Sequence, residues 1–155
     1  MSNLTLLIPA NKESESLPIF LKELSFYNHK KIIVLQKEDE ETINSIKEFK
    51  DVHLCIQKNK GYGSAIKEGL EKVNTEFFCI INADGSMDPK YLYQMLKDCE
   101  NNDLIFASRY LKGGGSDDDN FVTFIGNKGF SFLGNLLFKL GLSDILYTYI
   151  LGRTV

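Results

Sequence analysis

The chain has 155 residues, enough for one domain with a substantial hydrophobic core. Hydrophobic residues make up 43% and charged residues 25%, a balance typical of a folded globular protein and not of a disordered one. The formal net charge of -3 excludes the broad basic surface that nucleic-acid binding usually requires, so we expect no nucleic-acid partner.

The first half of the chain alternates between strand and helix patterns. Apolar runs at 4–8, 31–35 and 52–56 predict three strands, the last of them near a sheet edge because it is less apolar. Apolar residues at helical spacing predict a helix over 17–24 and a weaker one over 36–50.

The alternation continues in the second half. A helix is predicted after Gly63, a fourth strand at 77–81 and a fifth at 103–107. Between these strands, Asp88 is expected to cap a helix that Pro89 begins. The pattern predicts an α/β fold with a mostly parallel sheet and helices on both faces.

After residue 109 the composition changes. Residues 113–119 are rich in glycine and aspartate, which predicts a mobile acidic loop. Residues 121–140 are apolar and long enough to span a bilayer, but their lysines and glycines favour a buried or interfacial helix. Asn127, Ser131 and Asn135 recur every fourth residue and predict a polar stripe on that helix.

The ends of the chain and its cysteines bear on location. The first residues lack the basic region and apolar core of a signal peptide, and the three cysteines form no CxxC pair. We therefore expect a cytoplasmic protein with reduced thiols. No complete element is expected after Tyr149, which favours one domain over 1–155 that is truncated at its C-terminus.

Polar residues follow the fourth predicted strand directly. Asn82, Asp84 and Asp88 offer oxygen ligands at a strand end, where open α/β sheets bind ligands and where a hard divalent cation could sit. The simpler interpretation is a turn at Asp84 and Gly85 with Asp88 as a helix cap. The cap is favoured for Asp88, and both interpretations stay open for Asp84.

A second candidate site precedes the third helix. Gly61 and Gly63 would let the backbone approach a ligand, the helix N-terminus favours phosphate, and Lys60 adds positive charge. The spacing fits neither the P-loop motif nor the dinucleotide-binding motif.

Taken in order, these motifs resemble family-2 glycosyltransferases, and most of all the dolichol-phosphate mannose synthases and bacterial polyprenyl-phosphate sugar transferases. The matching stretches are Pro9-Ala10 with Glu13, 59–65 with Gly69, 82–86 with Pro89, and 107–110 with 113–114. The resemblance implies a GT-A nucleotide-diphospho-sugar transferase fold, a Rossmann-like three-layer sandwich. It also implies an inverting, hexosyltransferase-type enzyme that uses Mg or Mn.

The resemblance assigns roles to individual residues. Residues matching the donor site are Pro9, Ala10, Glu13, Lys60, Gly63, Asn82, Ala83 and Asp84. Residues matching the metal site are Asp84, Asn82 and Ser86. Residues matching the acceptor-phosphate site are Arg109 and Lys128. The candidate catalytic residues are Asp84, Arg109 and Asp144.

Three positions depart from the family pattern. Gln36 stands near the place of an acid that reads the nucleotide base, and Asn82 replaces the first acid of the DxD motif. Asp144 matches a C-terminal motif whose arginine cannot be placed. These departures keep a second hypothesis open, a degenerate GT-A domain that binds nucleotide or a protein partner without catalysis.

The resemblance also implies the partners. The donor would be a nucleotide-diphosphate sugar, and the acceptor a polyprenyl phosphate or a saccharide, with peripheral contact at the inner face of the membrane. A phosphate acceptor is largely ionised near neutral pH, since its second pKa is about 6, and it needs positioning more than a base. A sugar hydroxyl needs a general base, for which Asp144 is the one candidate.

Overall fold

The computed structural model describes residues 3–111, 114–115 and 121–154. They form two compact units, one of residues 1–105 with 151–155 and the other of residues 106–150. Apart from Gly114 and Gly115, the predicted mobile loop at 113–119 lies outside the described residues.

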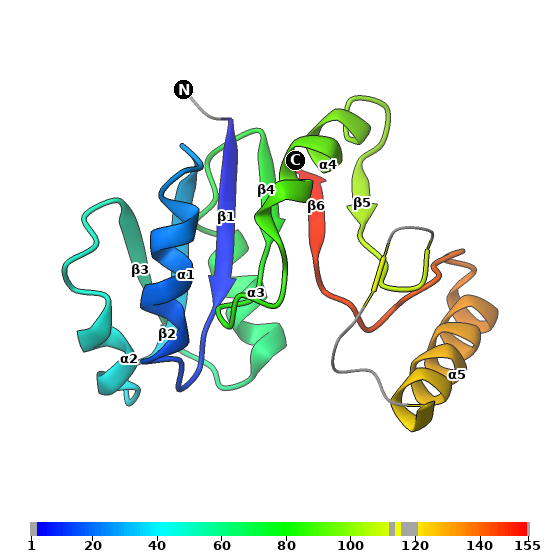
Figure 1. The fold of residues 1–155 in the computed structure, drawn as a ribbon, viewed down its shortest axis with the longest axis horizontal. Helices are drawn as coiled ribbons and strands as arrows, with labels where there is room; N and C mark the ends of the chain where they lie inside the picture. The colour runs from blue at the N-terminus through cyan, green and yellow to red at the C-terminus, as the bar shows by residue number, and fades with distance from the viewer. Residues whose placement is uncertain (1–2, 112–113, 116–120, 155) are drawn as a thin grey trace. The chain divides into compact units, whose positions relative to one another are not determined.

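A six-stranded sheet has the order β3-β2-β1-β4-β6-β5 (Figure 1). The strands are β1 Leu4–Pro9, β2 Lys30–Gln36, β3 Val52–Gln57, β4 Phe77–Ile80, β5 Leu104–Phe106 and β6 Ile150–Arg153. β1 pairs in parallel with β2 and β4, and β2 pairs in parallel with β3. The predicted mostly parallel sheet is confirmed, and β3 is an edge strand as expected.

Helices cover both faces of the parallel strands. Helices α1 Ser16–Leu24 and α2 Glu40–Ser45 contact each other on one face, whereas α3 Tyr62–Leu70 lies on the other and contacts β1, β2 and β3 (Figure 1). Every residue of β1 is buried, as expected for a central strand that is covered on both sides. The core of this unit therefore consists of strand side chains packed between two helix layers.

The approach of α3 to the sheet depends on Gly69. A Cβ atom at this position would collide with side-chain atoms of Leu7 in β1 and Val34 in β2. Only a residue without a side chain lets the C-terminal end of the helix lie this close to the sheet.

Two predicted features differ in the structure. Helix α2 begins only after Asp39, whose side chain accepts from the Thr42 N–H, and it ends at Ser45 instead of continuing to Lys50. The expectation of no element after Tyr149 is wrong, because β6 occupies a place in the sheet. Four residues that include Gly152 carry too weak a strand pattern to be recognised in sequence.

The helix predicted after Asp88 forms in two parts. A short 3₁₀ turn, η1 Pro89–Tyr91, leads into α4 Leu92–Asp98. Asp88 accepts a hydrogen bond from the Lys90 N–H at 2.9 Å and lies beside the Lys90 ammonium group. The predicted cap is confirmed.

The second unit contains one long helix, α5 Phe121–Phe138. Among the described residues, no helix is both long enough and apolar enough to cross a membrane. A buried or interfacial helix was expected here, and the buried alternative is wrong for the outer side of α5, where large apolar side chains are exposed. The interfacial alternative stays a prediction. Its predicted polar stripe is confirmed, since Asn127, Ser131 and Asn135 share the side that contacts the rest of the unit.

Candidate functional site

The first unit contains a hollow of about 370 Å³ at the C-terminal ends of β1, β2, β3 and β4. Its lining residues are Pro9, Ala10, Asn11, Glu13, Gln36, Gln57, Gly61, Tyr62, Ala65, Asn82, Ala83 and Asp84. This is the edge of an open α/β sheet where ligands characteristically bind. Six of the eight residues predicted for the donor site line it, from segments far apart in sequence.

A larger hollow of about 770 Å³ lies elsewhere in this unit, between β3 and α3. Lysine and glutamate side chains line it, and it contains none of the predicted site residues. Because its position is along the strands and not at their ends, we take the smaller hollow as the candidate site.

The loop after β1 is held in place by the start of α2. The Lys12 N–H donates to the Asp39 carboxylate at 2.7 Å, and the Glu13 N–H donates to the Thr42 hydroxyl at 3.0 Å. Lys12 itself has φ 61°, a left-handed conformation that is costly for a residue with a side chain. The Ser16 hydroxyl donates to the Glu13 carboxylate, which fixes the side chain that lines the hollow.

The segment before α3 is shaped by Glu68, one of the helix's own residues. Its carboxylate accepts from the N–H groups of Lys58 and Asn59 at 2.7 and 2.9 Å, and these hydrogen bonds lower its pKa. The helix then begins after Gly61, whose φ of 106° favours glycine. Lys60 is exposed and does not line the hollow.

Gly63 differs from its predicted role. A Cβ atom there would meet no atom within 4 Å, and Gly63 is absent from the lining of the hollow. The backbone conformation that requires glycine is found two residues earlier, at Gly61. Sequence reasoning named both glycines but assigned the site role to the second.

Asp84 stands in a turn at the end of β4 and also lines the hollow. One carboxylate oxygen accepts from the Ser86 N–H at 2.9 Å, and Gly85 has φ 75°. The neighbouring Asn82 accepts at its side-chain oxygen from the Tyr62 hydroxyl at 3.1 Å. Both interpretations of Asp84 are therefore compatible with the structure, because one carboxylate can close a turn and face a ligand.

A divalent cation fits this donor set only as a lightly ligated ion. No group of three or more His, Cys, Asp and Glu side chains gathers anywhere in the described part of the chain. Asp84 supplies one carboxylate, and the Asn82 oxygen already accepts from Tyr62. Mg²⁺ commonly takes one or two carboxylates and completes its shell with water and phosphate oxygens, so one carboxylate suffices for such an ion.

The ends of β2 and β3 bring two carboxamides to the hollow. Gln36 and Gln57 are register partners across the two strands, and the Gln57 amide donates to the Asn59 carbonyl. Sequence reasoning noted Gln36 as a departure but missed Gln57, Asn11 and Tyr62. Their positions could have indicated a role at the site, because neighbouring parallel strands end at the same edge of the sheet.

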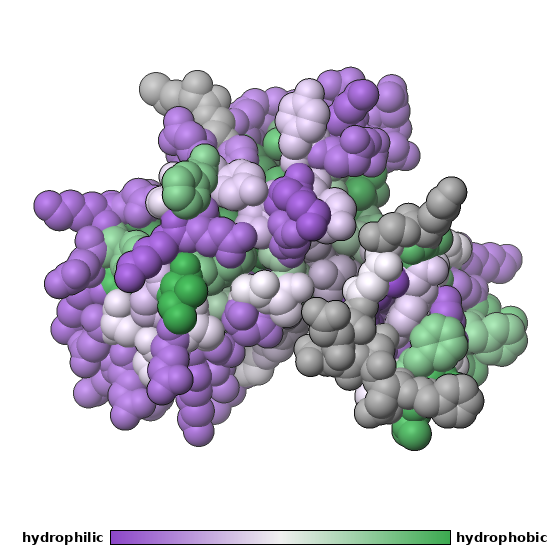
Figure 2. All heavy atoms as spheres, in the orientation of Figure 1, coloured by the Kyte–Doolittle hydropathy of each residue, from purple (hydrophilic) through white to green (hydrophobic). Residues whose placement is uncertain are grey.

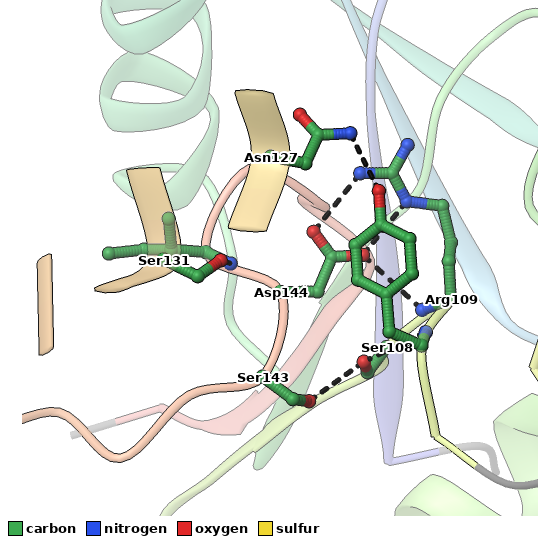
Figure 3. A network of polar contacts seen from close by, with 8 residues as sticks. Ser108, Arg109, Asn127, Ser131, Ser143 and Asp144 are labelled. Atoms are coloured by element: carbon green, nitrogen blue, oxygen red, sulfur yellow. Dashed lines mark hydrogen bonds and ion pairs between the residues drawn. The ribbon is translucent and has the colours of Figure 1, made fainter. Parts of the chain in front are cut away.

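The second unit contains a polar network centred on Arg109 and Asp144 (Figure 3). The Arg109 Nε and an Nη atom donate to the two Asp144 oxygens at 2.8 and 3.0 Å, and the Arg109 N–H donates at 3.3 Å. The Asp144 side chain is 0% exposed and that of Arg109 is 19% exposed. Both oxygens of Asp144 thus accept from Arg109, an arrangement that suits positioning the guanidinium better than general-base catalysis.

Tyr110 brings the second predicted cation to the same place. The Lys128 ammonium lies 4.6 Å from the centre of the Tyr110 ring, and the Arg109 guanidinium lies 5.3 Å from it. The Tyr110 hydroxyl accepts from the Asn127 amide at 2.7 Å, which ties the ring to α5. Both residues predicted for the acceptor phosphate therefore flank one aromatic ring.

The polar stripe of α5 holds the segment that carries Asp144. Asn135 bonds to both backbone groups of Leu142, at 2.7 and 2.9 Å. The Ser131 hydroxyl accepts from the Ile145 N–H at 3.1 Å. These contacts fix the backbone on either side of Asp144, whose carboxylate points toward Arg109 in Figure 3.

The sequence matches the model of the family described as glycosyl transferase family 2 over residues 5–154. This chain belongs to that family. An uncharacterized glycosyltransferase of Mycobacterium tuberculosis is 26% identical to this family-2 chain over 106 residues, covering 68% of it and 48% of the relative.

Solved structures with the same fold include two sugar-phosphoglycerate synthases. Mannosyl-3-phosphoglycerate synthase from Rubrobacter xylanophilus matches with a TM-score of 0.75 and 14% identity, over 97% of this chain and 53% of that one. Glucosyl-3-phosphoglycerate synthase from M. tuberculosis, in complex with Mn²⁺, UDP-glucose and phosphoglyceric acid, matches with a TM-score of 0.65 and 14% identity. That match covers 97% of this chain and 56% of the synthase.

These matches establish the fold of this family-2 chain as α/β of the GT-A type, as the sequence predicted. The chain spans about half the length of the relatives that it matches. The narrower resemblance to the polyprenyl-phosphate branch is not separately supported by them, since these solved relatives are sugar-phosphoglycerate synthases.

Proposed function

We propose that this chain transfers a sugar, with inversion, from a nucleotide-diphosphate sugar to a phosphate-bearing acceptor, with polyprenyl phosphate as the favoured acceptor. One observation carries the proposal: Arg109 and Lys128 converge on Tyr110 while Asp144, the one candidate base, is already bonded to Arg109. Two cations, with no carboxylate left over for general-base catalysis among the described residues of this network, suit an acceptor that is already an anion.

The chemistry on the acceptor side follows from charge. A phosphate monoester is largely ionised at neutral pH, so its oxygen can attack the anomeric carbon without losing a proton to the protein. The bond between that carbon and the diphosphate breaks, and the nucleoside diphosphate leaves with the electron pair. Arg109 and Lys128 would bind and orient the acceptor phosphate, while Asp144 would hold Arg109 in place.

The donor would lie in the hollow at the strand ends. Glu13 and Asp84 line that hollow, and its described lining contains no lysine or arginine, so a diphosphate there needs another source of positive charge. Mg or Mn held by Asp84, with oxygen from Asn82 or Ser86, would supply it and neutralise the leaving diphosphate. The carboxamides of Gln36 and Gln57 can both donate to and accept from a nucleobase, which suits them to contact the base.

Calorimetric titration with UDP-glucose and GDP-mannose, each with Mn²⁺, tests the donor site. We expect the Asp84→Asn variant to lose metal-dependent binding by at least about tenfold, because it removes the one carboxylate at the diphosphate. Asp88→Asn is the matched control, since Asp88 is an exposed acid four residues away that caps a helix. Equal binding by the two variants would refute the assignment of Asp84.

The acceptor is tested by following sugar transfer from the donor that binds. We expect transfer to a short-chain polyprenyl phosphate, and a loss in Lys128→Gln that appears as a raised KM for the acceptor. Transfer to 3-phosphoglycerate instead would keep the phosphate-binding role and reject the lipid. Transfer only to a sugar without phosphate would reject the acceptor proposal.

A second candidate function is a domain that binds nucleotide or a protein partner without catalysis. Asn82 favours it, because an amide stands where the family has an acid and its oxygen is occupied by Tyr62. Turnover that disappears in Asp84→Ala would reject this candidate. Donor binding without turnover of any tested acceptor would favour it.

A further inference from the structure

The outer side of α5 carries an apolar seam with alternating spacings of four and three residues. Its members are Val122, Gly126, Gly129, Leu133 and Leu136, all exposed. This spacing repeats every seven residues and is the pattern by which one helix packs along another. Figure 2 shows apolar side chains at the surface of this part of the chain.

Rotation of α5 about its own axis cannot bury this seam within the unit. The opposite side of the helix bears Asn127, Ser131 and Asn135, whose side chains bond to Tyr110 and to the backbone of 142–145. Rotating α5 would break these bonds and leave polar groups without partners. The apolar side is therefore directed outward by the structure of the unit itself.

The exposed apolar area is comparable in size with one side of a standard protein interface. Beside the seam, further large apolar side chains are exposed: Ile125, Phe130, Phe132 and Leu137. Taking about 200 Å² for each fully exposed side chain, the outer side presents on the order of 900 Å² of accessible surface. A standard protein interface buries roughly 800 Å² on each partner.

We propose that this outer seam binds a second copy of the same chain, α5 against α5. Glycines lie at the middle of the seam, and a Cβ atom on Gly126 or Gly129 would meet no atom of the described chain within 4 Å. Glycine at a helix surface costs stability, and at these two positions no close packing against the described residues requires it, whereas it lets two helices approach closely. The proposal does not depend on the transferase activity.

A lipid surface fits this helix less well. Helices that lie on membranes usually carry lysine and arginine on their polar side, whereas the polar stripe of α5 is uncharged and engaged within the protein. Lys128 is the only charged residue between 121 and 138. Three aspartates at 117–119 precede the helix, and the chain has a net charge of -3, which anionic lipids would repel.

Sedimentation velocity over about 1 to 100 µM tests the proposal on the 155-residue chain. We expect a dimer whose Kd rises more than about tenfold in the double variant Leu133→Glu with Leu136→Glu, because like charges would face each other. The matched control is Ile19→Glu with Phe26→Glu, which changes two exposed apolar residues of the first unit, 70% and 89% exposed. The control variant is expected to dimerise like the unchanged chain.

Cross-linking locates the contact without adding charge. Gly129 is the midpoint of the seam, so it faces its own copy whether the two helices run parallel or antiparallel. We expect Gly129→Cys to form a disulfide-linked dimer on mild oxidation, and Ile19→Cys to form none above the background of the native cysteines.

Three results would overturn the proposal. The first is a monomer throughout the concentration range, and the second is a dimer that the Leu133 and Leu136 changes leave intact. The third is a monomer that co-sediments with phosphatidylglycerol-containing vesicles and loses that binding in the same double variant. This last result would assign the outer seam to a lipid surface. Circular dichroism of each variant verifies that α5 and the sheet remain folded.

Discussion

Replacing Asp144 by asparagine isolates the contribution of the ion pair in the second unit. The substitution keeps the size of the side chain but removes its charge and one of its acceptors, while three Arg109 N–H groups still point at it. Removing one partner of a buried ion pair costs about 3 to 5 kcal/mol. Arg109 is 19% exposed and can turn partly to water, so we expect about 3 kcal/mol.

Urea unfolding followed by circular dichroism measures this loss. In thermal unfolding of a chain of this length, a loss of about 3 kcal/mol corresponds to a fall in Tm of roughly 6 to 12 °C. The control is the double variant Arg109→Met with Asp144→Leu, which removes both charges and should cost less than Asp144→Asn alone. A loss below about 1 kcal/mol, or a double variant less stable than the single one, would refute the reasoning.

Three further predictions concern the first unit. Gly69→Ala should destabilise the chain by about 1 to 3 kcal/mol in the same urea unfolding assay. The cost of overpacking against Leu7 and Val34 exceeds the gain in helix propensity, which is about 1 kcal/mol. An unchanged or raised stability would contradict the close approach of α3 to the sheet. Asp39→Ala should cost at least about 1 kcal/mol, because it removes the cap of α2 and also the acceptor of the Lys12 N–H, and Glu40→Ala, beside it, is the control. Burial and the nearby Lys31 lower the pKa of His29 below 6.5 in the folded chain. The unfolded chain therefore binds a proton on His29 more readily than the folded chain does, and the free energy of unfolding should fall as pH drops below about 6.5. His29→Gln should remove that component of the pH dependence, and an identical slope between pH 7 and 5 would argue against it.

Sequence patterns predicted the first three strands well because apolar residues dominate each of them, most strongly in the buried β1 and β2. The strands at 4–8, 31–35 and 52–56 reappear within one or two residues as β1, β2 and β3. β6 escaped prediction for a physical reason. Leu104 and Phe78 fill the space where a side chain of Gly152 would lie. The strand is therefore stabilised by tertiary packing, which a four-residue sequence pattern does not reveal.

The candidate site likewise contains residues that could be predicted from sequence and a pairing that could not. Residues at strand ends, such as Asp84 and Gln36, were predictable because topology alone brings them together. The pairing of Arg109 with Asp144 was not, since 35 residues separate them and no local pattern links the two. The donor, metal and acceptor roles of these residues stay predictions until binding and transfer are measured.

The hydrogen bonds that the Glu68 carboxylate accepts from the segment before α3 have a consequence for the thermodynamics of binding. A loop that is ordered only by its ligand loses about 1 to 2 kcal/mol of backbone entropy per residue at that moment. Here the N–H groups of Lys58 and Asn59 are already held, and the Gln57 amide holds the Asn59 carbonyl. The segment therefore loses little conformational freedom when a ligand binds in the hollow. The entropy cost of ordering it is part of the free energy of folding and does not reduce the affinity for the ligand.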